Sequence, residues 1–260
     1  MDALAERDPL LRRQVLAEAQ AASALSHPNI ATLYELGEHD DQPYLVFEFV
    51  QGQRLSALIA GRPLNAWRAI EYASEIADAL ADAHASGLIH QAISPDTVIV
   101  TARGHAKTLD FGMGTYLVAV VSGTPGRDAL DGAMPYWAPE QSAGTTADHR
   151  ADIYALGLVL IEMLTGQRWP GGGAPLGNLP HEVAGIIRNM IADQPNRRFD
   201  SAATLAAELR QATAIDRRPA VVTSPHAAPA RPAAGGPTWI LLGLAVAIAI
   251  TLFWLAARLW

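Results

Sequence analysis

Residues 88–100 read LIHQAISPDTVIV, and the interpretation of the whole chain turns on this stretch. Apolar residues at both ends enclose a centre that holds Ser94, Pro95 and Asp96, which are typical turn formers. The pattern predicts a strand, a tight turn and a second strand. The first question is whether the polar residues of this turn carry out a reaction or only shape the turn.

The composition is that of a folded chain. It has 260 residues, of which 50% are hydrophobic and 17% charged, enough for one domain of about 200 residues with attachments. The net charge of −7 gives no electrostatic reason to expect nucleic acid as a partner. There is no cysteine, and the eight histidines form neither H-x-x-x-H nor H-E-x-x-H. Disulfides and thiolate metal sites are therefore excluded, and no zinc site is predicted.

The pattern of apolar residues predicts an α+β fold with a mainly helical second part. Residues 10–26 are expected to form a helix, and residues 30–50 two strands around an EHDDQP turn. One apolar face and a following Gly87 predict a long helix over residues 64–87. Residues 150–166 are apolar nearly all round, so this helix should be buried. Two further helices are expected in residues 179–194 and 201–213, while the Gly- and Pro-rich residues 168–180 disfavour one.

The end of the chain predicts a membrane anchor. Residues 239–257 carry neither charge nor proline, and about 20 helical residues cross a bilayer core. A Pro- and Ala-rich linker, residues 216–238, precedes them and contains Arg217, Arg218 and Arg231. These arginines favour a cytoplasmic position for the N-terminal side. The expected organisation is a domain over residues 1–215, divided near residue 50, then the linker 216–238 and a transmembrane helix over 239–260.

Several short motifs in order carry a family resemblance. They are LAEAQAASALSHPNI (16–30), YLVFEFVQGQRL (44–55), the opening LIHQAISPDTVIV (88–100), KTLDFGMG (107–114), PYWAPEQ (135–141) and ADIYALG (151–157). From about residue 10 to residue 211 the chain resembles bacterial Ser/Thr protein kinases of the transmembrane receptor type. The resemblance implies a protein-kinase-like fold anchored in the bacterial inner membrane, with the kinase-like domain in the cytoplasm.

The resemblance also assigns positions around a nucleotide. It places the glutamate of the smaller lobe's helix at Glu18 and the gatekeeper of the adenine site at Phe47. The backbone of Glu48 and Val50 would face the base, in the hinge between the lobes. Asp110, the aspartate of D-F-G, would be the remaining ligand for Mg²⁺.

A second set of positions implied by the resemblance is architectural. Phe111 and Gly112 complete D-F-G, and Phe111 is expected to pack under the helix that carries Glu18. Glu140 of A-P-E is expected to pair with Arg198. Asp152, at the start of a buried helix, should accept backbone N–H bonds from the turn at residues 90–92.

The catalytic loop itself departs from the family pattern H-R-D-x-K-P-x-N. His90 is present, but Gln91 replaces the arginine and Ala92 occupies the position of the general base. Ser94 stands at the lysine position, and Thr97 stands at the asparagine that binds a second Mg²⁺. Because a methyl group cannot accept a proton, the resemblance predicts no catalytic residue in this degenerate loop.

The segment before Glu18 departs from the pattern as well. No G-x-G-x-x-G occurs there, and the single lysine, Lys107, lies on the other side of the expected cleft. The prediction is an incomplete smaller lobe without the family's first three strands. An alternative is a longer gene in which Met1 is an internal start.

These features predict a membrane-anchored, catalytically impaired kinase-like protein that acts as a regulatory or scaffolding module. Its partners would be proteins, such as another Ser/Thr kinase or its substrate. No cofactor would be required, with weak binding of ATP and Mg²⁺ through Asp110 left open. The alternatives are a divergent or truncated Ser/Thr kinase that transfers the ATP γ-phosphate, and a decaying gene product.

Overall fold

The computed structural model describes residues 9–39, 42–114, 134–169, 176–177 and 179–216. The predicted transmembrane helix over 239–260 and nearly all of the predicted linker lie outside these residues. Within the described part of the chain, no helix has both the length and the apolar character needed to cross a bilayer.

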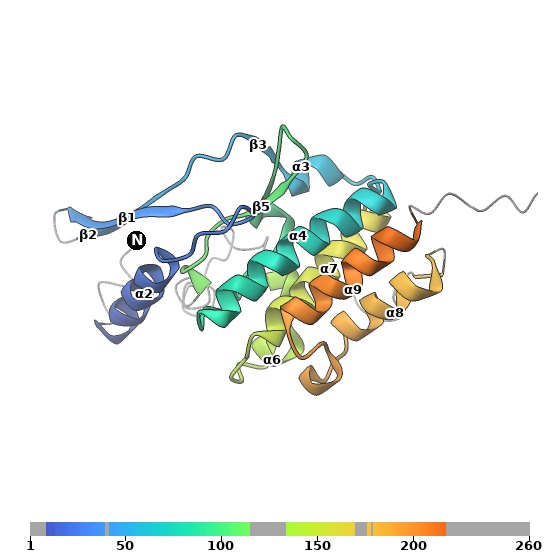
Figure 1. Ribbon diagram of the computed structural model, residues 1–260. Coiled ribbons are helices and arrows are strands. Elements are labelled where there is room, and N and C mark those ends of the chain that lie inside the picture. Colours follow the sequence, from blue (N-terminus) through green and yellow to red (C-terminus); the bar gives the residue numbers. More distant parts are fainter. Residues whose placement is uncertain (1–8, 40–41, 115–133, 170–175, 178, 217–260) are drawn as a thin grey trace, which may run out of the picture. The chain divides into compact units, whose positions relative to one another are not determined.

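The described elements divide into a β-containing N-terminal part and a mainly helical C-terminal part that also holds a small sheet. In chain order they are α2 (Pro9–Ala22), β1 (Leu33–His39), β2 (Gln42–Phe47), β3 (Gly52–Arg54), α3 (Leu55–Ile59), α4 (Ala66–Ala85), η1 (Pro95–Thr97), β4 (Val98–Thr101), β5 (Ala106–Thr108), η2 (Met134–Tyr136), α6 (Pro139–Ser142), α7 (Arg150–Thr165), α8 (His181–Met190), η3 (Pro195–Arg197) and α9 (Ala202–Asp216). The η elements are short 3-10 helices. The α+β class expected from the sequence is therefore confirmed, and Figure 1 shows the two parts.

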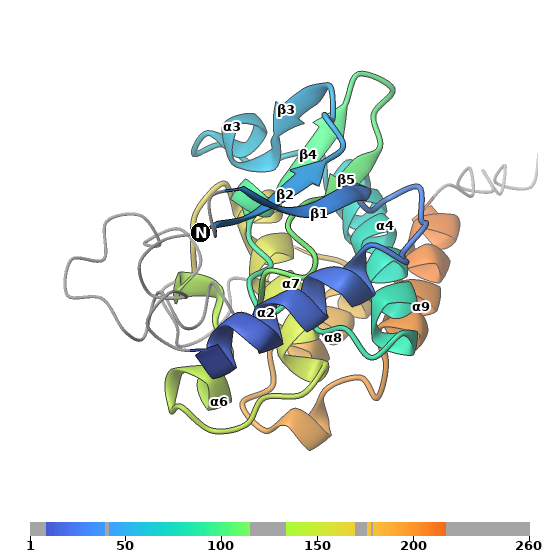
Figure 2. The same ribbon diagram turned by 90° about the vertical axis from the view of Figure 1, so that its left-hand side faces the viewer.

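Among the described residues, the N-terminal part, residues 9–47, consists of helix α2 and one β-hairpin. Strands β1 and β2 pair antiparallel, with Leu36 opposite Leu45 and Gly37 opposite Tyr44. The Tyr44 ring lies over Gly37, where any side chain would collide with it, and its hydroxyl donates to Glu35 at 2.7 Å. A larger residue at position 37 would therefore displace the Tyr44 ring from its place over the strand. Figure 2 shows α2 beneath the hairpin.

The C-terminal part is built on the two helices that the sequence predicted most firmly. The Asn65 side chain caps α4 by accepting from the backbone N–H of Trp67 and Arg68. Helix α7 is buried on nearly all sides, as its uniform apolar pattern predicted. Helices α4, α7 and α9 lie side by side, with α8 next to α9 (Figure 1).

The strand–turn–strand prediction for residues 88–100 is only half right. Val98–Thr101 forms β4, the central strand of a three-stranded sheet in the order β3-β4-β5. Residues 88–94 form no strand, and Gln91 has a φ of 64°, which an extended strand cannot contain. The backbone N–H groups of residues 90–92 donate to side chains and not to a neighbouring strand. The sequence predicted neither β3 nor α3.

Candidate functional site

The loop that contains Ala92 is held by one buried carboxylate. Asp152, in the first turn of α7, is 0% exposed and accepts the backbone N–H of His90 at 2.8 Å and of Gln91 at 2.7 Å. The His84 ring contacts the same carboxylate, with Nε2 2.8 Å from Oδ2. The contacts from His90 and Gln91 are those expected from the sequence. His84 was missed, and its only signal was a polar residue in the last turn of an Ala-rich helix.

His90 joins this loop to the segment that carries D-F-G. Its Nδ1 accepts the backbone N–H of Ala92 at 3.3 Å, and its Nε2 lies 2.8 Å from the carbonyl of Leu109. A carbonyl only accepts, so Nε2 donates the hydrogen of this bond. The ring also meets Phe111 edge-on, with centroids 4.7 Å apart. Both ring nitrogens of His90 are therefore occupied by backbone contacts that hold the loop and the D-F-G segment together.

The positions of the base and of the second metal ligand are closed off. Ala92 is 3% exposed, and its side chain ends in a methyl group. The Thr97 hydroxyl accepts the backbone N–H of Ser94 at 3.0 Å and donates to the Ser94 carbonyl at 3.0 Å. The hydroxyl thus closes its own turn. Asp96 points elsewhere, because its carboxylate bonds to the Ser56 hydroxyl in α3 at 2.5 Å.

The D-F-G triplet keeps a specific backbone geometry. Asp110 has a φ of 62° and Gly112 a φ of 82°. A Cβ on Gly112 would lie 2.7 Å from the Ala22 Cβ and 3.1 Å from the Glu18 carbonyl. Gly112 therefore packs directly against α2, which explains why glycine is needed there. Phe111, 2% exposed, belongs to the same core as α2.

The hinge contains an ion pair that the sequence did not predict. Lys107 Nζ bonds to both carboxylate oxygens of Glu48, at 2.5 and 2.6 Å, and Glu48 also accepts the backbone N–H of Thr32 at 3.1 Å. Burial raises the pKa of Glu48, but the hydrogen bonds from Lys107 and Thr32 outweigh this and lower it. The sequence assigned only the backbone of Glu48 and Val50 to the site, and Val50 is buried.

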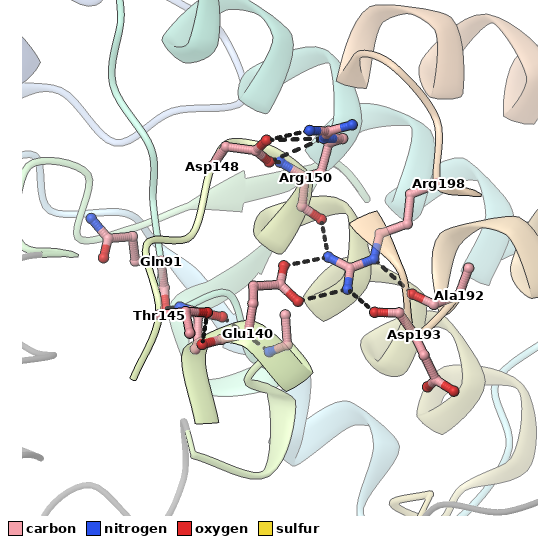
Figure 3. Close-up of polar contacts among 10 residues, drawn as sticks. Gln91, Glu140, Thr145, Asp148, Arg150, Ala192, Asp193 and Arg198 are labelled. Atoms are coloured by element: carbon pink, nitrogen blue, oxygen red, sulfur yellow. Dashed lines mark hydrogen bonds and ion pairs between the residues drawn. The ribbon is translucent and has the colours of Figure 1, made fainter. Parts of the chain in front are cut away.

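A second ion pair, between Glu140 and Arg198, lies below the loop and was expected from the sequence (Figure 3). Arg198 is fully buried at its side chain and donates to both oxygens of Glu140, at 2.6 and 2.8 Å. Three backbone carbonyls, those of Arg150, Ala192 and Asp193, accept its remaining hydrogens. The pKa of Glu140 is raised by burial and lowered more strongly by Arg198 and a backbone hydrogen bond together. This arginine is therefore fully satisfied and structural.

Few groups remain that could hold a metal ion. No cluster of three or more His, Asp or Glu side chains with a metal-binding arrangement occurs among the residues that the structure describes. Of the two positions at which the family binds metal, Asp110 carries a carboxylate. The other position is Thr97, whose hydroxyl bonds to the backbone of its own turn. Mg²⁺ is usually held by one or two carboxylates together with substrate phosphates. The described residues therefore do not fit the two-metal arrangement of phosphoryl transfer.

A loop pinned by Asp152, a D-F-G turn packed on α2 and a buried Glu140–Arg198 pair together define the protein-kinase class of fold. Comparison with known sequences agrees, because the protein kinase domain family matches residues 3–173. The chain belongs to this family.

The relatives are bacterial. The chain is 34% identical over 224 residues to the serine/threonine-protein kinase PrkC of Bacillus subtilis, covering 79% of this chain and 34% of PrkC. It is 30% identical over 226 residues to the serine/threonine-protein kinase PknB of Mycobacterium tuberculosis, covering 78% of this chain and 36% of PknB. The chain thus spans about a third of the length of these relatives.

A solved structure extends the likeness to three dimensions. The kinase domain of Mycobacterium tuberculosis PknI, crystallised as a point mutant, superposes with a TM-score of 0.63 at 26% identity. The match covers 82% of this chain and 83% of that structure. Similarity to bacterial Ser/Thr kinases, expected from the sequence motifs, is therefore confirmed.

Proposed function

We propose that this protein is a catalytically impaired member of the kinase family that acts as a regulatory or scaffolding module for a protein partner. One observation carries the proposal: the position of the general base is the buried methyl group of Ala92. Around it, two scaffold contacts expected of the family are present, Asp152 under the loop and the Glu140–Arg198 pair. In this proposal the chain has lost the residues that catalyse phosphoryl transfer and has kept residues that hold the fold together.

The expected loss of rate is large. Removing a general base costs about 10²- to 10⁴-fold. The Thr97 hydroxyl, turned into its own loop, offers no second metal ligand, and the single lysine of the chain is committed to Glu48. Because such groups act as a unit, the separate losses do not multiply, but they all act in the same direction.

A protein partner fits the surface of the N-terminal part. The large apolar side chains that are exposed within the described residues all precede Gln51; they are Leu10, Tyr34, Tyr44, Val46 and Phe49. Large apolar side chains exposed to solvent are candidates for contact with a partner protein. We also propose that residues 239–260 anchor the protein in the bacterial inner membrane, because their sequence has the length and composition of a membrane span.

A divergent Ser/Thr kinase is the second candidate. The observation that favours it is Asp110, which retains the carboxylate, the positive φ and the contact of its triplet with α2. In this case Asp110 would hold Mg²⁺ with the phosphates of ATP, and residual transfer would proceed without a base.

Two measurements on the full chain decide between the candidates. The proposal expects no Mg²⁺-dependent ATP turnover above that of the Asp110→Asn variant, which removes the last metal ligand. A thermal-unfolding titration with ATP, with and without Mg²⁺, then reports whether nucleotide binds at all. Turnover that Asp110→Asn abolishes would establish the divergent kinase.

The anchor is tested separately. The full chain should remain in the membrane fraction after alkaline carbonate washing, whereas Ile248→Arg should reduce insertion, because a central arginine costs about 2.5–3.5 kcal/mol. Recovery of the unaltered protein in the wash would disprove the anchor.

A further inference from the structure

A groove lies between α8 and α9, and its lining includes no residue of the loop of Ala92. It has a volume of about 460 Å³. Its lining includes the apolar side chains of Ile186, Phe199 and Ala212 and, at the exposed rim, those of His181, Glu182 and Glu208. Figure 1 shows the two helices that form it lying next to each other. None of these side chains takes part in the contacts of the catalytic loop, the D-F-G triplet, the hinge or the Glu140–Arg198 pair described above.

The two glutamates of the rim differ from other surface acids of the helical part. Neither Glu182 nor Glu208 has an ion-pair or hydrogen-bond partner for its carboxylate among the residues that the structure describes. In contrast, Asp78 on α4 pairs with Arg210 of α9 at 2.5 Å. Both glutamates are exposed, so the groove presents two carboxylates, beside the imidazole of His181.

A small apolar pocket adjoins the groove. It has a volume of about 110 Å³ and shares Glu182 and Ala212 with the groove. The rest of its wall includes Trp67, Ile70 and Val183, so it is apolar. An apolar cavity of about 150 Å³ stays dry and takes up benzene, which sets the scale of ligand that such a pocket accepts. The pocket suits one branched aliphatic side chain.

We propose that this groove docks a cationic polypeptide segment of a partner protein. An arginine or lysine of the partner would bond to Glu182 and Glu208, and a neighbouring apolar side chain would enter the adjoining pocket. Charge complementarity selects this class of partner, because two carboxylates repel the phosphates of nucleic acids and of anionic lipids. The inference rests on the proposed scaffolding function and names the surface and the chemistry that it would use.

The test uses the full chain in a nonionic detergent and three fluorescein-labelled peptides. In the first peptide, two arginines flank a pair of leucines; the second replaces the arginines by glutamates, and the third replaces the leucines by serines. Fluorescence anisotropy measures the three dissociation constants. The proposal expects the first peptide to bind most tightly and added salt to weaken it, since exposed charge pairs are screened.

Variants assign the binding to the groove. Glu182→Gln and Glu208→Gln should each weaken binding of the arginine–leucine peptide about three- to tenfold. Asp82→Asn is the matched control, because this exposed carboxylate on α4 lines neither the groove nor the pocket. Ala212→Leu should fill the pocket and abolish the advantage of the leucine peptide over the serine peptide. Ala66→Leu, at another wall of the pocket, serves the same purpose if Ala212→Leu unfolds.

Equal affinity for all three peptides would overturn the proposal, as would an Asp82→Asn effect as large as that of Glu182→Gln. No binding of the first peptide would overturn it too. None of these results bears on the measurement of ATP turnover, so failure of the docking site and failure of the proposed function remain distinguishable.

Discussion

Lys107 and Glu48 join the strand that leads to D-F-G to the hinge, with Lys107 Nζ 2.6 Å from Glu48 Oε2. The two residues lie 59 positions apart in the sequence, and their side chains are only 16% and 23% exposed. In this kinase-like chain the single lysine thus forms an ion pair with the hinge.

Removing this lysine should destabilise the fold. Lys107→Met leaves the Glu48 carboxylate half-buried without its cation, and we expect a loss of about 1–2 kcal/mol in the free energy of unfolding. Urea denaturation measures it. Arg210→Met is the control, because its pair with Asp78 is exposed and should contribute less than about 1 kcal/mol. Additive losses in the double variant Glu48→Gln/Lys107→Met would show that the two side chains do not interact.

Arg198 should tolerate no replacement by lysine. A lysine ammonium cannot supply the two parallel bonds to Glu140 together with the bonds to three carbonyls, so Arg198→Lys should cost about 2–4 kcal/mol. The adjacent Arg197 is exposed, and Arg197→Lys should change stability by less than about 0.5 kcal/mol. Comparable melting temperatures for the two variants would contradict the structural role of Arg198.

The same pair predicts a dependence of stability on acid pH. The pKa of Glu140 is lower in the folded chain than its ordinary value, despite the opposing effect of burial, because Arg198 stabilises the carboxylate. Its contribution is therefore complete above the unfolded pKa of about 4.3 and is lost as pH falls through the folded pKa. The stability difference between the unaltered protein and Glu140→Gln should shrink below about pH 4.5. A difference that stays constant down to about pH 3 would rule this linkage out.

Gly112 offers a test of the contact between D-F-G and α2. Gly112→Ala combines a positive φ with a Cβ 2.7 Å from the Ala22 Cβ, and we expect a loss of about 2–4 kcal/mol. Gly144 has a φ of 68°, and a Cβ there would meet no atom within 4 Å, so Gly144→Ala should cost only about 1 kcal/mol. Calorimetric unfolding compares the two. Equal losses would mean that the close packing on α2 contributes nothing.

The sequence by itself determined the family, the order of the main elements and which residue types occupy the positions of the catalytic loop. Ala92 lacks a proton acceptor in any conformation, and the motifs from residue 16 to residue 157 follow the kinase order. Helices α4 and α7 were predictable because α4 repeats its apolar residues with the helical period and α7 is apolar throughout. Patterns of this kind can be read from a short stretch of sequence, because they depend only on residues a few positions apart.

Only the tertiary structure decided how the remaining polar groups are used. Residues 88–94 have the apolar pattern of a strand. No strand forms there, because the backbone N–H groups of residues 90–92 donate to the side chains of Asp152 and His90. The pairing of Lys107 with Glu48 and the docking of His84 on Asp152 join residues that are 59 and 68 positions apart. Such contacts depend on how the elements pack, because a buried charge or N–H group bonds to whichever partner the fold brings within reach.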